Sequence, residues 1–172
     1  KDDKIDAKAI ALYAYRRREE IKPYKLPSRH LLELRRLLSL RDKLVRQRAG
    51  FKSTNKEIKG HLSKTDNETY FTVHENMINH ISKEIVVVEK QLRLIINKDK
   101  NLKELFKLII SIKGVGEQTA MFMIAYTNGF TLFDNARKFA SYAGVAPFPY
   151  RSGTSVHGRN KVNQLANKKF KS

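Results

Sequence analysis

The 172-residue sequence contains no cysteine, and this absence removes several kinds of chemistry at once. Disulfide bonds, thiol nucleophiles and cysteine-based zinc sites are all excluded. No apolar run approaches the ~20 residues that a membrane-spanning helix needs, and no signal-peptide segment follows the first residues. The first residue is Lys1 and no methionine precedes it, so we expect the sequence to be a piece of a longer protein.

Acidic residues are scarce relative to basic ones. The sequence has 35 Lys and Arg against 17 Asp and Glu, which gives a formal net charge of +18. This excess favours binding to DNA or RNA, because Lys and Arg gain by displacing condensed counterions from phosphates. Residues 63–113 are nearly balanced, with 9 basic and 7 acidic residues, so the basic surfaces are expected on either side of them.

Hydrophobic periodicity predicts an all-α fold organised around a long antiparallel helical hairpin. A first helix is expected at residues 3–20, followed by a proline-containing linker at 21–27. The hairpin helices are expected at 28–62, with Ser28 as N-cap, and at about 66–98. Thr65 and Glu68 have capping-box spacing at the start of the second helix.

One stripe of residues at alternating spacings of three and four marks each hairpin helix, which is typical of a coiled coil. His74 is interpreted as a packing residue of this stripe. Pairing within one chain and pairing between chains both remain open, and a dimer or higher homo-oligomer through residues 28–98 is expected. The expected stripes are Leu37, Leu40, Leu44, Gln47, Phe51, Thr54 and Ile58 in the first helix, and Phe71, His74, Ile78, Ile81, Ile85, Val88, Leu92 and Ile95 in the second.

A small helical domain is expected at residues 99–172. Its predicted helices span residues 101–112, 118–126 and about 135–143, and Gly144 ends the third. Two prolines after Gly144 force extended chain, and residues 163–171 are able to form a last helix.

Gly114 and Gly116 lie between two of these expected helices. A helix–Gly-x-Gly–helix turn lets a nucleic-acid backbone come close, with the N–H groups of the second helix facing a phosphate. The pattern resembles the helix-hairpin-helix, which binds DNA backbone without sequence preference. The alternative is a simple interhelical turn that needs a positive φ angle.

Two further groups of residues carry candidate chemistry. Ser152, followed by Gly153 in a basic loop, can act as a nucleophile towards a phosphodiester if a base or metal activates it. Asp3 and Asp6 share a helix face at the i,i+3 spacing and can hold one Mg²⁺ ion between them. The simpler alternatives are ordinary loop residues and helix N-terminal acids. The residues expected to contact nucleic acid are Gly114, Gly116, Arg151, Gly153, His157, Arg159, Lys161, Lys168 and Lys169.

The order of these features resembles the insertion-sequence 110/1111 family of DEDD-type transposases. The match rests on Ile-x-Gly-Val-Gly-x-x-Thr-Ala at 112–120, Ala-Gly-Val-Ala-Pro at 143–147, Ser-Gly at 152–153 and Gly-Arg-x-Lys at 158–161. Residues 1–7 resemble the segment that carries the last two acids of the family's metal-binding tetrad. The first Asp and the Glu of that tetrad have no counterpart here.

The resemblance implies a DNA recombinase of the prokaryotic cytoplasm. Residues 1–27 would be the end of a RuvC-like nuclease domain with its linker, residues 28–98 a coiled-coil hairpin and residues 99–172 most of a C-terminal transposase domain. Ser152 would be the nucleophile, with Ser155 and Tyr150 as rivals. Asp3 and Asp6 would belong to an incomplete Mg²⁺ site, with no tightly bound cofactor in the fragment, and a structured guide RNA would be a further partner beside DNA. The alternative is a non-catalytic helix-hairpin-helix module on a coiled-coil dimeriser.

Overall fold

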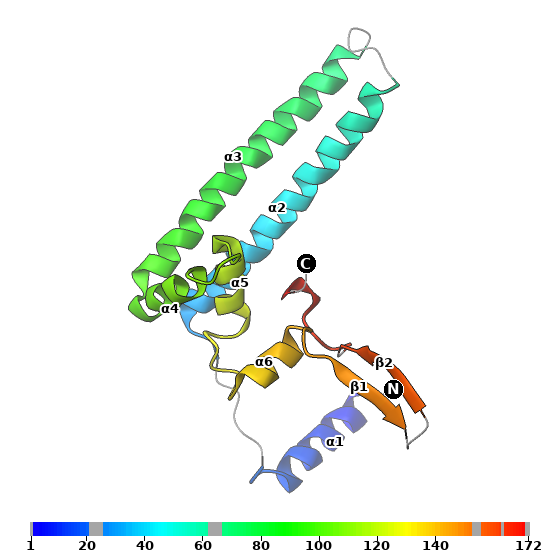
Figure 1. Ribbon diagram of the computed structural model, residues 1–172, viewed down its shortest axis with the longest axis vertical. Coiled ribbons are helices and arrows are strands. Elements are labelled where there is room, and N and C mark those ends of the chain that lie inside the picture. The colour runs from blue at the N-terminus through cyan, green and yellow to red at the C-terminus, as the bar shows by residue number, and fades with distance from the viewer. Residues whose placement is uncertain (1, 21–25, 62–66, 153–155, 163, 171–172) are drawn as a thin grey trace.

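The structure is a computed structural model that describes residues 2–20, 26–61, 67–152, 156–162 and 164–170 (Figure 1). The fold is mostly helical, as the sequence predicts, and adds one pair of short strands. None of the helices in the described ranges combines the length and the hydropathy that a membrane crossing requires. The elements are α1 (Asp3–Arg16), α2 (Arg29–Lys59), α3 (Glu68–Lys98), α4 (Lys100–Ile110), α5 (Glu117–Tyr126), α6 (Ala136–Tyr142), β1 (Phe148–Ser152), β2 (Val156–Lys161) and the 3-10 turn η1 (Lys168–Phe170).

Helices α2 and α3 lie side by side as a long antiparallel hairpin within one chain (Figure 1). Ser28 begins α2 as its N-cap, because its Oγ accepts a hydrogen bond from the Leu31 amide at 3.3 Å. Asn67 is the N-cap residue of α3, and its side chain makes no capping hydrogen bond. Thr65, the first residue of the expected capping box, lies outside the described residues. Arg41 Nε donates to Glu89 Oε1 at 2.7 Å and joins the two helices across the seam.

The predicted stripe of α3 is confirmed, but that of α2 is wrong in part. Six of the eight predicted α3 residues are buried, and the other two, His74 and Ile78, are partly buried. In α2, Leu40 is 43% exposed, and Gln47 and Thr54 are exposed as well. Leu37, Leu44, Phe51 and Ile58 are partly buried, and Leu37 and Leu44 pack against the core. The covered surface of α2 is wider than one stripe, because α2 contacts α5 as well as α3. The other residues on this surface include Leu34, Leu38, Arg41, Val45, Arg48 and Asn55.

The core lies at the base of the hairpin, where α4 and α5 pack across α2 and α3 (Figure 1). Arg35 of α2 ties the elements together, because its Nε donates to the Ala125 carbonyl at the end of α5 at 2.7 Å. The base of the hairpin thus holds the α4–α5 pair in a fixed position. The fully buried core side chains here are Leu34, Leu92, Ile95, Ile96, Met121 and Ile124.

Residues 163–171, which the sequence analysis considered able to form a helix, form no α-helix at the described positions 164–170. The described part of that segment holds only turns and the three-residue η1. Its path is set by tertiary contacts: the Asn167 amide donates to the Tyr142 carbonyl at 2.8 Å, and the Phe170 ring contacts the rings of Phe122, Phe139 and Tyr142. These contacts bring the C-terminal segment back over α5 and α6.

The extended chain predicted after Pro147 is present as β1, but its pairing with β2 was not predicted. The strands are antiparallel, with Arg151 opposite His157 and Ser152 opposite Val156. The register shifts between Phe148 and Tyr150, on either side of Pro149, which has no amide hydrogen to donate. Strands β1 and β2 follow α6 and lie away from the long α2–α3 hairpin (Figure 1).

Candidate nucleic-acid interface and nucleophile

The turn between α4 and α5 has the backbone that the two glycines were expected to allow. Gly114 has φ +92°, a value that side-chain-bearing residues rarely adopt, whereas Gly116 has φ −84° and is the N-cap of α5. A Cβ added at either position would meet no atom within 4 Å. The turn is thus open on its outer side, and a polymer backbone can come close to it.

The N-terminus of α5 differs from that of α4 in how its amide groups are satisfied. At α4, the Asp99 side chain accepts from the Asn101 and Leu102 amides at 3.0 and 3.2 Å. At α5, Gly116 offers no side chain, so no such cap exists. Glu117 in the first turn is held by Arg93 of α3, with Nε to Oε2 at 2.9 Å, which offsets its negative charge. An uncapped helix N-terminus beside an open turn is suited to an anion such as a phosphate.

Ser152 is the last residue of β1, at the tip of the β1–β2 hairpin. The adjacent rung of the ladder pairs Arg151 with His157, so three of the predicted residues come from two neighbouring rungs. Gly153 lies outside the described residues. The sequence interpretation treated this segment as a loop, although two extended stretches flanking a short glycine-containing segment are a hairpin signal.

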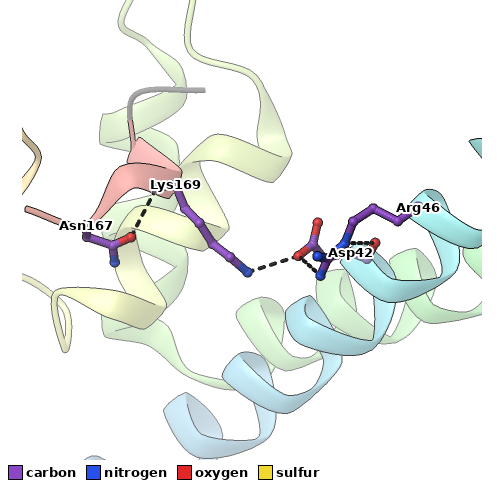
Figure 2. A network of polar contacts seen from close by, with 4 residues as sticks. All are labelled: Asp42, Arg46, Asn167 and Lys169. Atoms are coloured by element: carbon purple, nitrogen blue, oxygen red, sulfur yellow. Dashed lines mark hydrogen bonds and ion pairs between the residues drawn. The ribbon is translucent and has the colours of Figure 1, made fainter.

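The remaining predicted cations fall into two places. Arg159 and Lys161 are exposed on β2. Lys168 and Lys169 lie in η1, and Figure 2 shows Lys169 turned towards Asp42 of α2. Its Nζ donates to Asp42 Oδ2 at 3.0 Å, and Arg46 donates to the same oxygen at 2.8 Å. The hydrogen bond from Lys169, together with the charges of Lys169, Arg46 and Arg41, outweighs burial and lowers the pKa of Asp42 below 3.8.

Asp3 and Asp6 lie in the first turn of α1, whose described residues are all exposed. Asp2 is the N-cap of α1, and its side chain accepts a hydrogen bond from the Lys4 amide at 3.1 Å. The helix is therefore capped by Asp2 and not by Asp3 or Asp6. In the parts of the chain described here, no group of three His, Asp or Glu is placed to hold a metal ion. Two carboxylates at i,i+3 suit Mg²⁺ chemically but supply only part of its coordination, so further ligands have to come from elsewhere.

A cavity of about 310 Å³ lies beside the uncapped end of α5, and the sequence interpretation missed it. It is bounded by α2, α5 and η1, three elements that only tertiary folding brings together. The one local signal is the Phe122–Tyr126 pair at i,i+4, whose rings stack at 4.2 Å. Its lining residues are Leu38, Arg41, Asp42, Gln118, Thr119, Phe122, Tyr126, Lys169 and Phe170.

Two family models match the chain, one at each end. Residues 106–172 match the transposase IS116/IS110/IS902 family, and residues 1–66 match the transposase family of the IS110 DEDD type. The two matches flank α3 and correspond to the two ends of one kind of protein. The chain therefore belongs to the IS110 family of transposases, as its motifs predict.

Similar curated proteins agree with this assignment. Pilin gene-inverting proteins of Moraxella bovis and Moraxella lacunata are each 29% identical over 98 residues, which cover 57% of this chain and 30% of theirs. An uncharacterised 43.6 kDa protein of insertion element IS110 from Streptomyces coelicolor is 42% identical over 53 residues, 31% of this chain and 13% of its own. The chain thus spans less than a third of the length of the curated relatives it matches.

Proposed function

We propose that this chain is the nucleophile-bearing and nucleic-acid-binding part of a transposase that cleaves and exchanges DNA strands through Ser152. The observation that carries the proposal is the position of Ser152 at the tip of the β1–β2 hairpin, next to the Arg151–His157 rung and inside the matched segment 106–172. A serine at the end of a strand, where the chain turns back, is placed to meet a phosphodiester that approaches the tip of the hairpin. The pilin gene-inverting relatives support recombination as the kind of reaction.

The proposed reaction is a transesterification. A bond forms between Ser152 Oγ and a DNA phosphorus, and the bond from phosphorus to the 3′ oxygen breaks. The hydroxyl proton passes to a general base, and the departing 3′ oxygen takes up a proton to become a 3′-hydroxyl. The 5′ end of the strand stays joined to the protein as a phosphoserine ester, and attack by another 3′-hydroxyl reverses the step to complete exchange. Arg151 and Arg159 would offset the charge of the phosphorane.

Asp3 and Asp6 are proposed to contribute two carboxylates to the metal site of the full-length enzyme. A bound Mg²⁺ ion would stabilise negative charge on the reacting phosphate. Because the chain supplies only part of the coordination, the fragment alone is expected to bind nucleic acid without recombining it. A structured guide RNA is a proposed second partner, and residues 28–98 are proposed to join copies of the chain.

Covalent capture in the full-length transposase tests the role of Ser152. Wild type should form a protein–DNA adduct that survives denaturant, and Ser152→Ala should lose both the adduct and strand exchange. Ser155→Ala is the matched control, because it removes a serine hydroxyl only three positions away in the sequence, and it should retain both. Strand exchange by Ser152→Ala would exclude Ser152 as the nucleophile, and loss in Ser155→Ala alone would move the assignment to that residue.

The second candidate function is a non-catalytic nucleic-acid-binding module. The open Gly114–Gly116 turn and the uncapped N-terminus of α5 favour binding to a phosphate backbone without requiring any chemistry. The same adduct experiment separates the two functions. Tight binding with no covalent adduct in the wild-type full-length protein would favour the module.

A further inference from the structure

We propose that the cavity between α2, α5 and η1 binds one unstacked base of a single-stranded nucleic acid. This inference rests on the proposed nucleic-acid binding and adds a base-binding site to it. The cavity volume of about 310 Å³ lies at the lower end of the range of ~300–1,000 Å³ that small-molecule sites occupy. A volume of that size accommodates a single base with part of its sugar.

The aromatic wall of the cavity matches the flat face of a base. Phe122, Tyr126 and Phe170 all line it. The Phe122 ring stacks on Tyr126 with an interplanar angle of 28° and meets Phe170 edge-on at 4.9 Å between centroids. Aromatic rings hold the bases of single strands by stacking, which accepts every base because each has a π-face.

The polar groups of the cavity suit the edge of a base. Gln118 lines the cavity, and its buried Oε1 accepts no hydrogen bond from the residues that the structure describes, so its amide is not committed to another part of the fold. Asp42 also lines the cavity, and the hydrogen bond from Lys169 lowers its pKa further below neutral, so it is a carboxylate there. Its negative charge is matched by Lys169 and Arg46, so the cavity carries no unpaired charge that would repel the strand. Base edges carry both donors and acceptors, and the amide of Gln118 can serve either.

The position of the cavity connects it to the proposed backbone contact. Gln118 and Thr119 are in the first turn of α5, directly after the N-cap Gly116. A phosphate at this helix terminus and a base in the cavity would therefore both contact the first turn of α5. A duplex cannot satisfy both, because its bases are stacked inside the helix, so the site selects a splayed-out nucleotide.

Binding of short single strands with and without bases tests the proposal. The probes are a mixed-sequence DNA strand, an RNA strand of the same sequence, and a DNA strand of equal length in which every nucleotide is abasic. All three carry equal phosphate charge, so any difference from the abasic strand comes from the bases. The wild-type chain should bind the strands with bases at least about fivefold more tightly, the factor that corresponds to the weakest base–aromatic stacking.

Phe122→Leu and Gln118→Ala should each remove most of this difference while leaving the affinity for the abasic strand unchanged. Phe133→Leu, which alters an aromatic side chain outside the cavity, is the matched control and should keep the difference. Comparing the affinities for the DNA and RNA strands shows which of the two nucleic acids binds more tightly. Equal binding of all strands by the wild type, or a difference that both cavity variants retain, overturns the base site and leaves phosphate binding intact. Binding to none of the strands overturns the proposed nucleic-acid function itself.

Discussion

Gly114 and Gly116 differ in the backbone angle that decides whether a side chain is tolerated. Gly114 has φ +92°, in the region that glycine alone enters readily, and Gly116 has φ −84°, which any residue adopts. Neither position is crowded, since an added Cβ has open space at both. Substituting each glycine in turn therefore distinguishes the effect of backbone strain from the effect of covering a surface that is open to a ligand.

We predict that Gly114→Ala lowers the free energy of unfolding by about 1–3 kcal/mol through backbone strain. Gly116→Ala should change it by less than about 0.5 kcal/mol, because its φ angle and its surroundings accept a methyl group. Gly116→Ala should nevertheless weaken DNA binding severalfold, because the methyl group stands where a phosphate approaches α5. Urea denaturation and a DNA-binding titration measure the two effects. Equal destabilisation by both substitutions would contradict the strain at Gly114.

Asp42 predicts a small dependence of stability on acid pH. Because Lys169 lowers its folded-state pKa, the carboxylate stabilises the fold above about pH 3.8, and this contribution disappears as pH falls through the lower folded-state value. Asp42→Asn should therefore lose less stability than wild type between pH 5 and pH 3. The difference should stay below about 1 kcal/mol, because the two side chains are 49% and 41% exposed.

Urea midpoints at several pH values measure this difference, with Glu104→Gln as the control. Glu104 is an exposed carboxylate on α4, far along the chain from η1, and its substitution should leave the acid dependence of wild type unchanged. If Asp42→Asn and wild type lose stability in parallel, the ion pair with Lys169 does not hold η1 to α2 in solution.

At the scale of elements, α3 depends on one buried stripe, and two leucines two positions apart report on it. Leu92 is fully buried in the core, and Leu94 on the other face is 53% exposed. We predict that Leu92→Ala lowers the free energy of unfolding by about 2–5 kcal/mol, the usual loss of transfer energy plus a cavity. Leu94→Ala should stay within about 0.5 kcal/mol. Chemical denaturation compares them, and similar costs would mean that α3 is rotated in solution relative to this structure.

The elements show where sequence patterns are sufficient and where they fail. The α3 stripe was predicted correctly because its residues keep a regular alternation of three and four positions, and most of that length packs on one partner, α2. The α2 stripe was predicted wrongly at Leu40, because the base of α2 serves two partners and Arg41 crosses the seam to Glu89. A seven-residue repeat shows how the apolar residues are spaced along a helix. It does not show which flank of that stripe packs against a second helix.

The candidate site shows the same limit for contacts between distant segments. The turn at Gly114 and the N-cap at Ser28 were predictable, because each depends on the chemistry of adjacent residues. The β1–β2 pairing had a local hairpin signal that the sequence interpretation did not use, whereas the cavity at Gln118 depends on tertiary packing. The same holds for residues 164–170, where Phe170 contacts Phe122 of α5 and Phe139 of α6 in place of a continued helix.

At the scale of the whole molecule, the distribution of charge follows the arrangement of the elements. The nearly balanced segment at 63–113 forms α3 and α4, whose main contacts are with other helices. The excess of positive charge lies on α2, on the linker before it and on the C-terminal segments, with Arg159 and Lys161 exposed on β2. If β2 contacts phosphates, we expect Arg159 and Lys161 to contribute to the salt dependence of binding. Cations on the exposed face of α3 should contribute little to it.

We predict that the double variant Arg159→Ala/Lys161→Ala weakens duplex DNA binding and reduces the magnitude of the salt slope, d log K/d log[salt], by about 1.8. Each phosphate contact releases condensed counterions worth about 0.9 of slope on duplex DNA, so two lost contacts remove twice that. Lys83→Ala/Lys90→Ala removes the same net charge from the exposed face of α3 and should leave the slope nearly unchanged. Binding titrations at several salt concentrations measure both variants. A slope that falls equally in the two would mean that net charge, and not the β1–β2 hairpin, governs binding.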